Sequence, residues 1–149
     1  MLRLAIASDH GGFNLKADIF DALTKWGFVV EDLGTHSTAS CDYPDYAHLM
    51  ARTILDGRAD LGVLVCGSGV GMSIAANKHQ GIRAAVVSDP YSARKCREHN
   101  HANILCLGER VLGSGLALVC VRAWLDAVPD PDPRHVRRIA MIEPGKRAT

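Results

Sequence analysis

The chain has 149 residues, of which 48% are hydrophobic and 22% are charged, and its formal net charge is +1 at pH 7. This length suits one globular domain, expected to span residues 1–149, with a sizeable core. The near-neutral charge, and a most basic stretch as short as RHVRR at 134–138, exclude nucleic acid as a partner.

Short apolar runs alternate with longer amphipathic segments along the chain. The apolar runs predict strands at 2–7, 28–33, 61–66, 84–88 and 103–108. The other segments predict helices at 13–26, 45–55, 70–78, 90–99, 114–127 and 133–143. Strands that alternate with helices pair in parallel through right-handed crossovers. We therefore expect an α/β fold: a Rossmann-like, three-layer α/β/α sandwich around a five-stranded parallel sheet, with an added C-terminal helix.

Local signals support this division. Gly27 suits the end of the first helix, and Asp89 followed by Pro90 suits the start of the fourth. The last three predicted strands are almost continuously apolar, which predicts cover on both faces. The PDPDP run at 129–133 is a stiff break before the last helix.

The cysteines indicate the cellular setting. They are odd in number and lack CxxC spacing, which argues against a disulfide framework or a structural zinc site. The N-terminal apolar run is too short for a signal peptide, and no stretch approaches the ~18 apolar residues of a membrane span. A cytoplasmic protein that does not bind membranes is expected.

Ligands of open parallel sheets bind beyond the carboxyl ends of the strands, which directs attention to the loops there. Asp9 and His10 form a titratable pair after the first strand, followed by glycines that let a ligand approach the backbone. A helix-capping aspartate beside a solvent-exposed histidine is an equally good interpretation. Tyr43 precedes a proline that opens a helix, so its ring can overhang the same cleft.

The third strand ends at Cys66, in the stretch CGSGVG. The glycines at 67, 69 and 71 leave backbone N–H groups bare at a helix N-terminus, which binds anions and favours a thiolate. Ser68 adds a hydroxyl that can relay or stabilise charge. A buried structural cysteine is the alternative, and this interpretation is accepted for Cys41, Cys106 and Cys120. For Cys66 the position at the strand end favours a functional thiol.

Two further clusters lie at the far end of the fourth predicted helix and after the fifth predicted strand. His99 and Asn100 belong to a polar run, EHNHAN, for which surface solvation is the ordinary explanation. A metal site there has the wrong spacing for a helix-borne histidine pair, so no metal is expected. Arg110 follows the fifth strand, and Arg134 and Arg138 share one helix face, where they can bind a phosphate through forked hydrogen bonds. A solvated basic face is the alternative.

Six segments, taken together, resemble the type B ribose-5-phosphate isomerases, whose relatives include the allose-6-phosphate and galactose-6-phosphate isomerases. They are SDHGGFNLK, DYPDYA, CGSGVGMSIAANK, GIRAAVVSDPYSA, EHNHANILCLGERVLG and RHVRRIAMI, and the match runs from residue 2 to about residue 143. The resemblance implies interconversion of ribose 5-phosphate and ribulose 5-phosphate through a cis-enediolate, without a cofactor. A six-carbon sugar phosphate or a free aldose is the alternative substrate.

The resemblance also implies roles for single residues. Cys66 is the base that moves a proton between C2 and C1, with Ser68 near the reacting oxygens. His99 opens the furanose ring, and Asp9 assists. The residues implied in substrate binding are Gly67, Gly69 and Gly71 for the enediolate, His10, Arg110, Arg134 and Arg138 for the phosphate, and Tyr43 and Asn100 for the pocket wall.

The family is dimeric or tetrameric, so the resemblance implies a homodimer or homotetramer whose sites are shared between subunits, with residues 129–149 packing on a partner. Two features depart from the pattern. Met72 stands where one branch of the family has a catalytic glutamate, which places this chain in the cysteine branch. The PDPDP stretch shifts the arginine pair, which leaves Arg137 as an alternative phosphate ligand.

A non-catalytic nucleotide- or sugar-phosphate-binding module is the competing interpretation. Glycines after a strand, with Asp89 twenty residues beyond Gly69, are superficially like a dinucleotide fingerprint. That fingerprint needs the spacing G-x-G-x-x-G, however, and here the third glycine comes one residue early. The spacing therefore favours the isomerase.

Overall fold

The computed structural model describes residues 1–145, so the last four residues of the expected domain and of segment 129–149 lie outside the described part. The strands are β1 (Arg3–Ser8), β2 (Val29–Asp32), β3 (Leu61–Cys66), β4 (Ala84–Val86) and β5 (Ile104–Gly108). The helices are the 3-10 turn η1 (His10–Gly12), α1 (Phe13–Lys25), α2 (Tyr43–Leu55), α3 (Val70–Ala76), α4 (Pro90–Asn100), α5 (Ser114–Leu125) and α6 (Pro133–Ile142).

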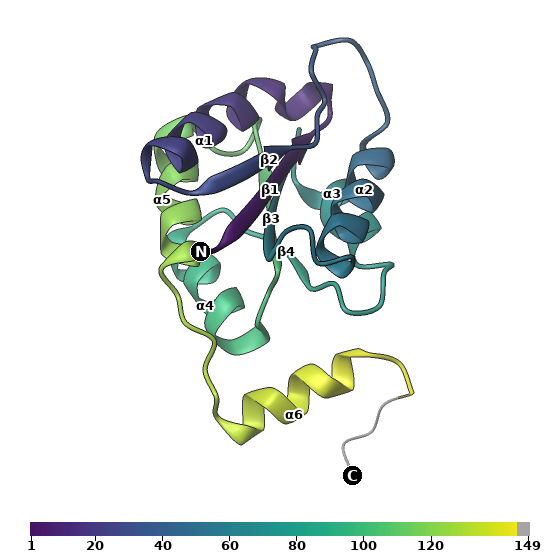
Figure 1. The fold of residues 1–149 in the computed structure, drawn as a ribbon, viewed down its shortest axis with the longest axis vertical. Helices are drawn as coiled ribbons and strands as arrows, with labels where there is room; N and C mark the ends of the chain where they lie inside the picture. The colour runs from purple at the N-terminus through teal and green to yellow at the C-terminus, as the bar shows by residue number, and fades with distance from the viewer. Residues whose placement is uncertain (146–149) are drawn as a thin grey trace.

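All five strands pair in parallel in one sheet, in the order β2-β1-β3-β5-β4. Helices α1, α4 and α5 cover one face and α2 and α3 cover the other, which makes three layers (Figure 1). Side chains alternate across a strand, so Val63 and Val65 of β3 pack toward the first face while Leu64 and Cys66 pack toward the second. The predicted α/β/α sandwich is confirmed.

The expectation of cover on both faces is right for β3 and β5, which are buried throughout, and wrong for β4. This strand has only three residues, and Val86 is 44% exposed. The reason is its place at the edge of the sheet. An apolar run shows that a strand exists, but the position of that strand in the sheet depends on pairing with distant segments.

Element bounds differ from the prediction by one or two residues, as helix and strand ends commonly do. Helix α2 begins at Tyr43, with Pro44 in its first turn. The predicted capping signals are confirmed: Asp89 accepts a hydrogen bond from the Ser92 N–H at 2.7 Å, and Gly27 takes a left-handed φ of 88° after α1.

Helix α6 lies apart from the sandwich, below the ends of α4 and α5 in Figure 1. None of its residues is buried, and its apolar side chains Val136, Met141 and Ile142 are all at least half exposed. Within residues 1–145, no helix is both long enough and apolar enough to cross a bilayer. An amphipathic helix with an uncovered apolar face is typical of a surface that meets another protein.

Candidate active site

Three loops meet at the carboxyl edge of the sheet because their strands are neighbours. The order β1-β3-β5 places the ends of these strands side by side, with Ser8 opposite Val65 and Cys66 opposite Gly108. The chain then turns back over the edge, where the Arg110 N–H donates to the Gly67 carbonyl at 3.0 Å. Residues far apart in the sequence thereby surround the end of β3.

A pocket of about 340 Å³ opens at this point. Seven residues predicted from the sequence line it together with Val111: Asp9, Tyr43, Cys66, Gly67, Ser68, Gly71 and Arg110. We call this set the sulfur half of the site. It combines a thiol, a carboxylate, a phenol and a guanidinium around bare backbone, which is a suitable environment for proton transfer on an anionic ligand.

Cys66, the last residue of β3, lines this pocket. The residue is only 5% exposed, and its Sγ accepts a hydrogen bond from the Gly69 N–H at 3.1 Å. An N–H donor aimed at sulfur stabilises negative charge there. The sequence interpretation assigned this amide to the substrate, whereas in the structure it is directed at the thiol.

Gly69 can reach this position because it has no side chain. Its φ is +79°, in the left-handed region, and a Cβ at this residue would lie 2.9 Å from the carbonyl carbon of Leu107. Both observations require glycine. Next to it, the Ser68 hydroxyl accepts from the N–H of Val70, the first residue of α3, at 3.2 Å.

The polar groups around the sulfur are held by local bonds. Asp9 is buried, and its Oδ1 accepts from the Gly11 N–H at 2.9 Å. His10 lies beside the pocket, with Nδ1 accepting from the Cys41 N–H at 3.2 Å. The Tyr43 ring lies directly over Gly71, where a Cβ would approach it to 2.8 Å.

The other buried cysteines have a different environment. Burial raises the pKa of Cys96 to about 11 and also raises the pKa of Cys106 and Cys120. These thiols stay protonated near neutral pH and act as small apolar groups of the core. Cys41 is partly exposed in the loop beside His10.

The remaining predicted residues form a second group, at the end of α4 and on α6. His99, Asn100 and Arg138 line a pocket of about 360 Å³ with His135, Ile139 and Ile142. Arg134 is exposed on the same helix, and its guanidinium pairs with Asp132 at 2.8 Å. We call His99, Asn100, His135, Arg134 and Arg138 the histidine half.

The two halves lie at opposite edges of the sheet. Cys66 ends β3 at the carboxyl edge, whereas His99 precedes the first residue of β5 by only five positions and so lies at the amino edge. A six-residue strand spans about 20 Å, and this length separates the edges. Among residues 1–145, the two pockets accordingly share no lining residue.

The end of α4 is held in place by two arginines. Arg83 donates to the carbonyls of Asn100 and His101 at 3.1 Å each, and Arg97 donates to the carbonyl of Ala102 at 3.1 Å. Burial lowers the pKa of both guanidinium groups. Cations at a helix C-terminus stabilise its unpaired carbonyls, so the turn that carries His99 is firmly placed.

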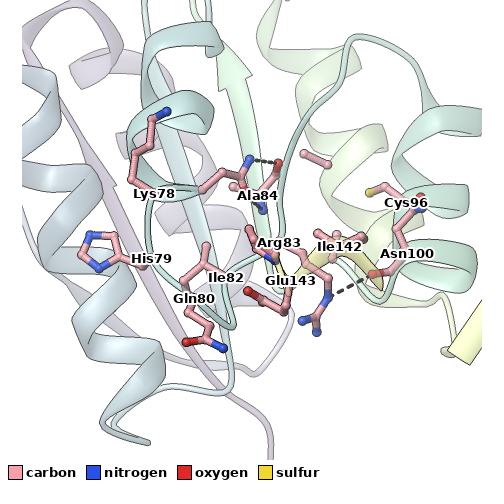
Figure 2. A pocket seen from close by; sticks show the side chains of 14 residues that line it. Lys78, His79, Gln80, Ile82, Arg83, Ala84, Cys96, Asn100, Ile142 and Glu143 are labelled. Carbon is pink, nitrogen blue, oxygen red and sulfur yellow. Dashed lines mark hydrogen bonds between the residues drawn. The ribbon is translucent and has the colours of Figure 1, made fainter. Parts of the chain in front are cut away.

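A larger cavity of about 760 Å³ lies between this turn, the edge strand β4 and the end of α6. Figure 2 shows it with Lys78, His79 and Gln80 on one side, and with Arg83 reaching the backbone of Asn100. Asn100 is the only predicted site residue in its lining. The cavity therefore adjoins the histidine half and has no part of the sulfur half.

Asp130 and His135 were missed by the sequence interpretation. The rings of His99 and His135 stack with centroids 4.3 Å apart and planes 8° from parallel, and Asp130 lies 3.5 Å from His135 Nε2. Ligand atoms of all three lie within 4.8 Å of one another. Parallel rings hold their nitrogen lone pairs in two separate planes, however, which disfavours one shared metal ion. The RHVRR motif contained His135, but nothing in its spacing indicated a partner on α4.

Comparison with known proteins shows the family of the chain. A family model described as Ribose/Galactose Isomerase matches residues 4–142. Ribose-5-phosphate isomerase B of Escherichia coli strain K12 is 47% identical over 142 residues, 95% of each chain. D-erythrulose-4-phosphate isomerase of Pectobacterium atrosepticum is 44% identical over 85% of this chain and 84% of its own.

Solved structures give the same result. Ribose 5-phosphate isomerase of Thermotoga maritima superposes with a TM-score of 0.91 at 49% identity, over 95% of this chain and 97% of its own. Ribose-5-phosphate isomerase B of Clostridium thermocellum gives 0.90 at 51% identity, over 93% of each chain. The match covers both halves of the site, and the chain therefore belongs to the ribose/galactose isomerase family of aldose–ketose isomerases.

Proposed function

We propose that this enzyme interconverts ribose 5-phosphate and ribulose 5-phosphate through a cis-enediolate, with Cys66 as the base that moves the proton between C2 and C1. The observation that carries the proposal is the sulfur half itself: a thiol with an N–H donor aimed at it, in a pocket shared with Asp9 and Arg110. The names of the relatives from Escherichia coli and Thermotoga maritima support the choice of sugar.

The pocket contains the kinds of group that formation of an enediolate requires. An enediolate carries negative charge that the sugar lacks, so donors fixed before the reaction stabilise the transition state more than the substrate. Gly67, Ser68 and Gly71 line the pocket, whereas the Gly69 N–H is directed at the sulfur. Arg110 can bind the phosphate by two parallel hydrogen bonds, with His10 beside it. No step of this mechanism needs a cofactor.

We further propose that a second copy of the chain completes the site. Ring opening by His99 with help from Asp9 requires both groups on one sugar, yet they lie at opposite edges of the sheet in one chain. His99, Asn100, Arg134 and Arg138 would enter from the partner. Exposed apolar side chains at the start of α3, on β4 and on α6 support an interface between copies: Val70, Ile74, Val86, Val136 and Met141.

The test is isomerisation of ribose 5-phosphate in deuterated water. The proposal expects deuterium from solvent at C1 of ribulose 5-phosphate, because a base that exchanges with water carries the proton. It also expects activity to survive chelation. Product free of deuterium would contradict the enediolate, and loss of activity with a chelator, followed by recovery with metal, would contradict the cofactor-free mechanism.

A four-carbon sugar phosphate is a second candidate substrate, favoured by the relative from Pectobacterium atrosepticum. A six-carbon sugar phosphate or a free aldose is the remaining alternative. Comparison of kcat/KM over four-, five- and six-carbon aldose phosphates and the free sugars distinguishes these. The highest value is expected for ribose 5-phosphate, and a higher value for another sugar would replace it.

A further inference from the structure

The junction between α4 and α6 contains a side-chain arrangement that the proposed chemistry has not used. His99 is in the last turn of α4, and its ring stacks on that of His135 at 4.3 Å. The carboxylate of Asp130 lies against the far ring, 3.5 Å from His135 Nε2. The side chain of His135 is only 19% exposed, although α6 as a whole is open to solvent.

Asp130 is fixed to α4 by its backbone as well. Its N–H donates to the Glu98 carbonyl at 2.8 Å, and its carbonyl accepts from the ring of His101 at 3.1 Å. Its Oδ1 also accepts from the Asp132 N–H, which starts α6. The segment 129–133 is therefore tied to the end of α4, and this tie sets where His135 stands.

The stacked ring is what orients His99. Within residues 1–145, no hydrogen bond to a ring nitrogen of His99 is present, so neither nitrogen is committed to a protein partner. An imidazole with both nitrogens open can rotate freely unless its faces are held. Stacking holds one face and fixes the plane of the ring while leaving the nitrogens open to a ligand.

We propose that His135, held by Asp130, is a positioning residue that sets the ring of His99 for opening the furanose. This inference rests on the proposed function of His99. Ring opening needs a proton placed on the ring oxygen while another leaves the C1 hydroxyl, so an acid or base that points wrongly is ineffective. The RHVRR motif would therefore supply a histidine that positions His99, as well as the arginines proposed to bind the phosphate.

A positioning role for His135 should affect one of two reactions of the enzyme, whereas a purely structural role should affect both. Ribose 5-phosphate exists mainly as a furanose and must be opened. Ribulose 5-phosphate cannot close such a ring, because the required C5 oxygen carries the phosphate. Exchange of its C1 hydrogen with deuterated water therefore needs the base of the sulfur half but no ring opening.

The experiment measures both reactions in the full-length enzyme. We expect His135→Ala to lower kcat/KM for ribose 5-phosphate about tenfold, a fraction of the ~10²–10⁴-fold that general acid–base catalysis contributes. Deuterium exchange into ribulose 5-phosphate should stay within about twofold of the unaltered enzyme. His135→Phe keeps a flat ring on His99 and should recover most of the activity, whereas Asp130→Asn should give a smaller loss than His135→Ala.

Control variants separate this inference from the proposed function. Asp126→Asn removes an exposed carboxylate at the end of α5, outside the junction, and should change neither reaction. His99→Asn should lower kcat/KM for ribose 5-phosphate more than His135→Ala does, while deuterium exchange into ribulose 5-phosphate is again largely kept. An unchanged kcat/KM for His99→Asn would overturn the role of His99 itself. The positioning role alone would be overturned if His99→Asn loses isomerisation but keeps exchange, while His135→Ala loses both reactions equally or loses neither.

Discussion

The two halves of the site are built in different ways. The sulfur half lies on the ends of three neighbouring strands in the middle of the sheet, where Cys66 and Asp9 are each less than 10% exposed. The histidine half lies on a helix end and on α6, which has no buried residue. Groups on central strands are held more precisely than groups on outlying segments. If the proposed function is right, the proposed base Cys66 is held rigidly, and the histidine half depends on assembly with a second copy.

The largest effect is expected from removing Cys66, the proposed base of the sulfur half. Cys66→Ala should lower kcat/KM for ribose 5-phosphate by at least ~10²–10⁴-fold, the usual contribution of a positioned acid or base. Sugar phosphate binding should survive, because the residues proposed to bind the phosphate are unchanged. The matched control is Cys120→Ala, a buried thiol on α5, whose effect should be on stability alone. A Cys66→Ala enzyme with most of its activity would remove the sulfur from the mechanism.

Mixing inactive variants tests whether the halves come from different copies. Cys66→Ala and His99→Asn homodimers should each be nearly inactive, but random exchange of their subunits should restore about a quarter of the unaltered activity, because each mixed dimer has one intact site. Asp9→Asn mixed with Cys66→Ala is the control, since both changes lie in the sulfur half and no intact site can form. Absence of recovery in the first mixture, after exchange is shown by mass spectrometry, would contradict the shared site.

Substitution of Gly69, compared with Gly27, distinguishes the effect of backbone strain from the effect of misplacing the N–H donor to the sulfur. Gly69→Ala should lower kcat/KM about 10²-fold, because loss of a fixed donor costs ~2.7–4 kcal/mol in other enzymes. The control is Gly27→Ala, since Gly27 has a similar φ of +88° but open space where a Cβ would stand. That variant should lose ~1–2 kcal/mol of stability, measured by denaturant unfolding, and keep its activity. Equal activity losses in both variants would mean that the Gly69 amide has no special role.

The smallest effect expected is a difference in rates of alkylation. Iodoacetamide reacts with thiolates, and burial raises the pKa of Cys96 to about 11, so this thiol stays protonated at pH 7.5. Peptide mass spectrometry should show Cys41 and Cys66 modified before Cys96, and ribose 5-phosphate should protect Cys66. Modification of Cys96 ahead of Cys66 would be inconsistent with a reactive sulfur half.

Local patterns determined much of this protein. Alternating apolar and amphipathic segments were enough to predict a parallel three-layer fold, because short strands that follow helices have few other ways to pair. The rule that ligands bind at carboxyl strand ends then pointed to Asp9, Cys66 and Arg110, which do share one pocket. These inferences succeed because each depends on a short stretch of chain and a general constraint of topology.

The tertiary structure alone decided the rest. The edge position of β4, the Gly69 N–H turned toward the sulfur, and the stacking of His135 on His99 each join segments whose spacing in the chain carries no signal. The separation of the two halves is of the same kind. A sequence lists a thiol and a histidine thirty-three residues apart, and only the direction in which α4 crosses the sheet places them at opposite edges.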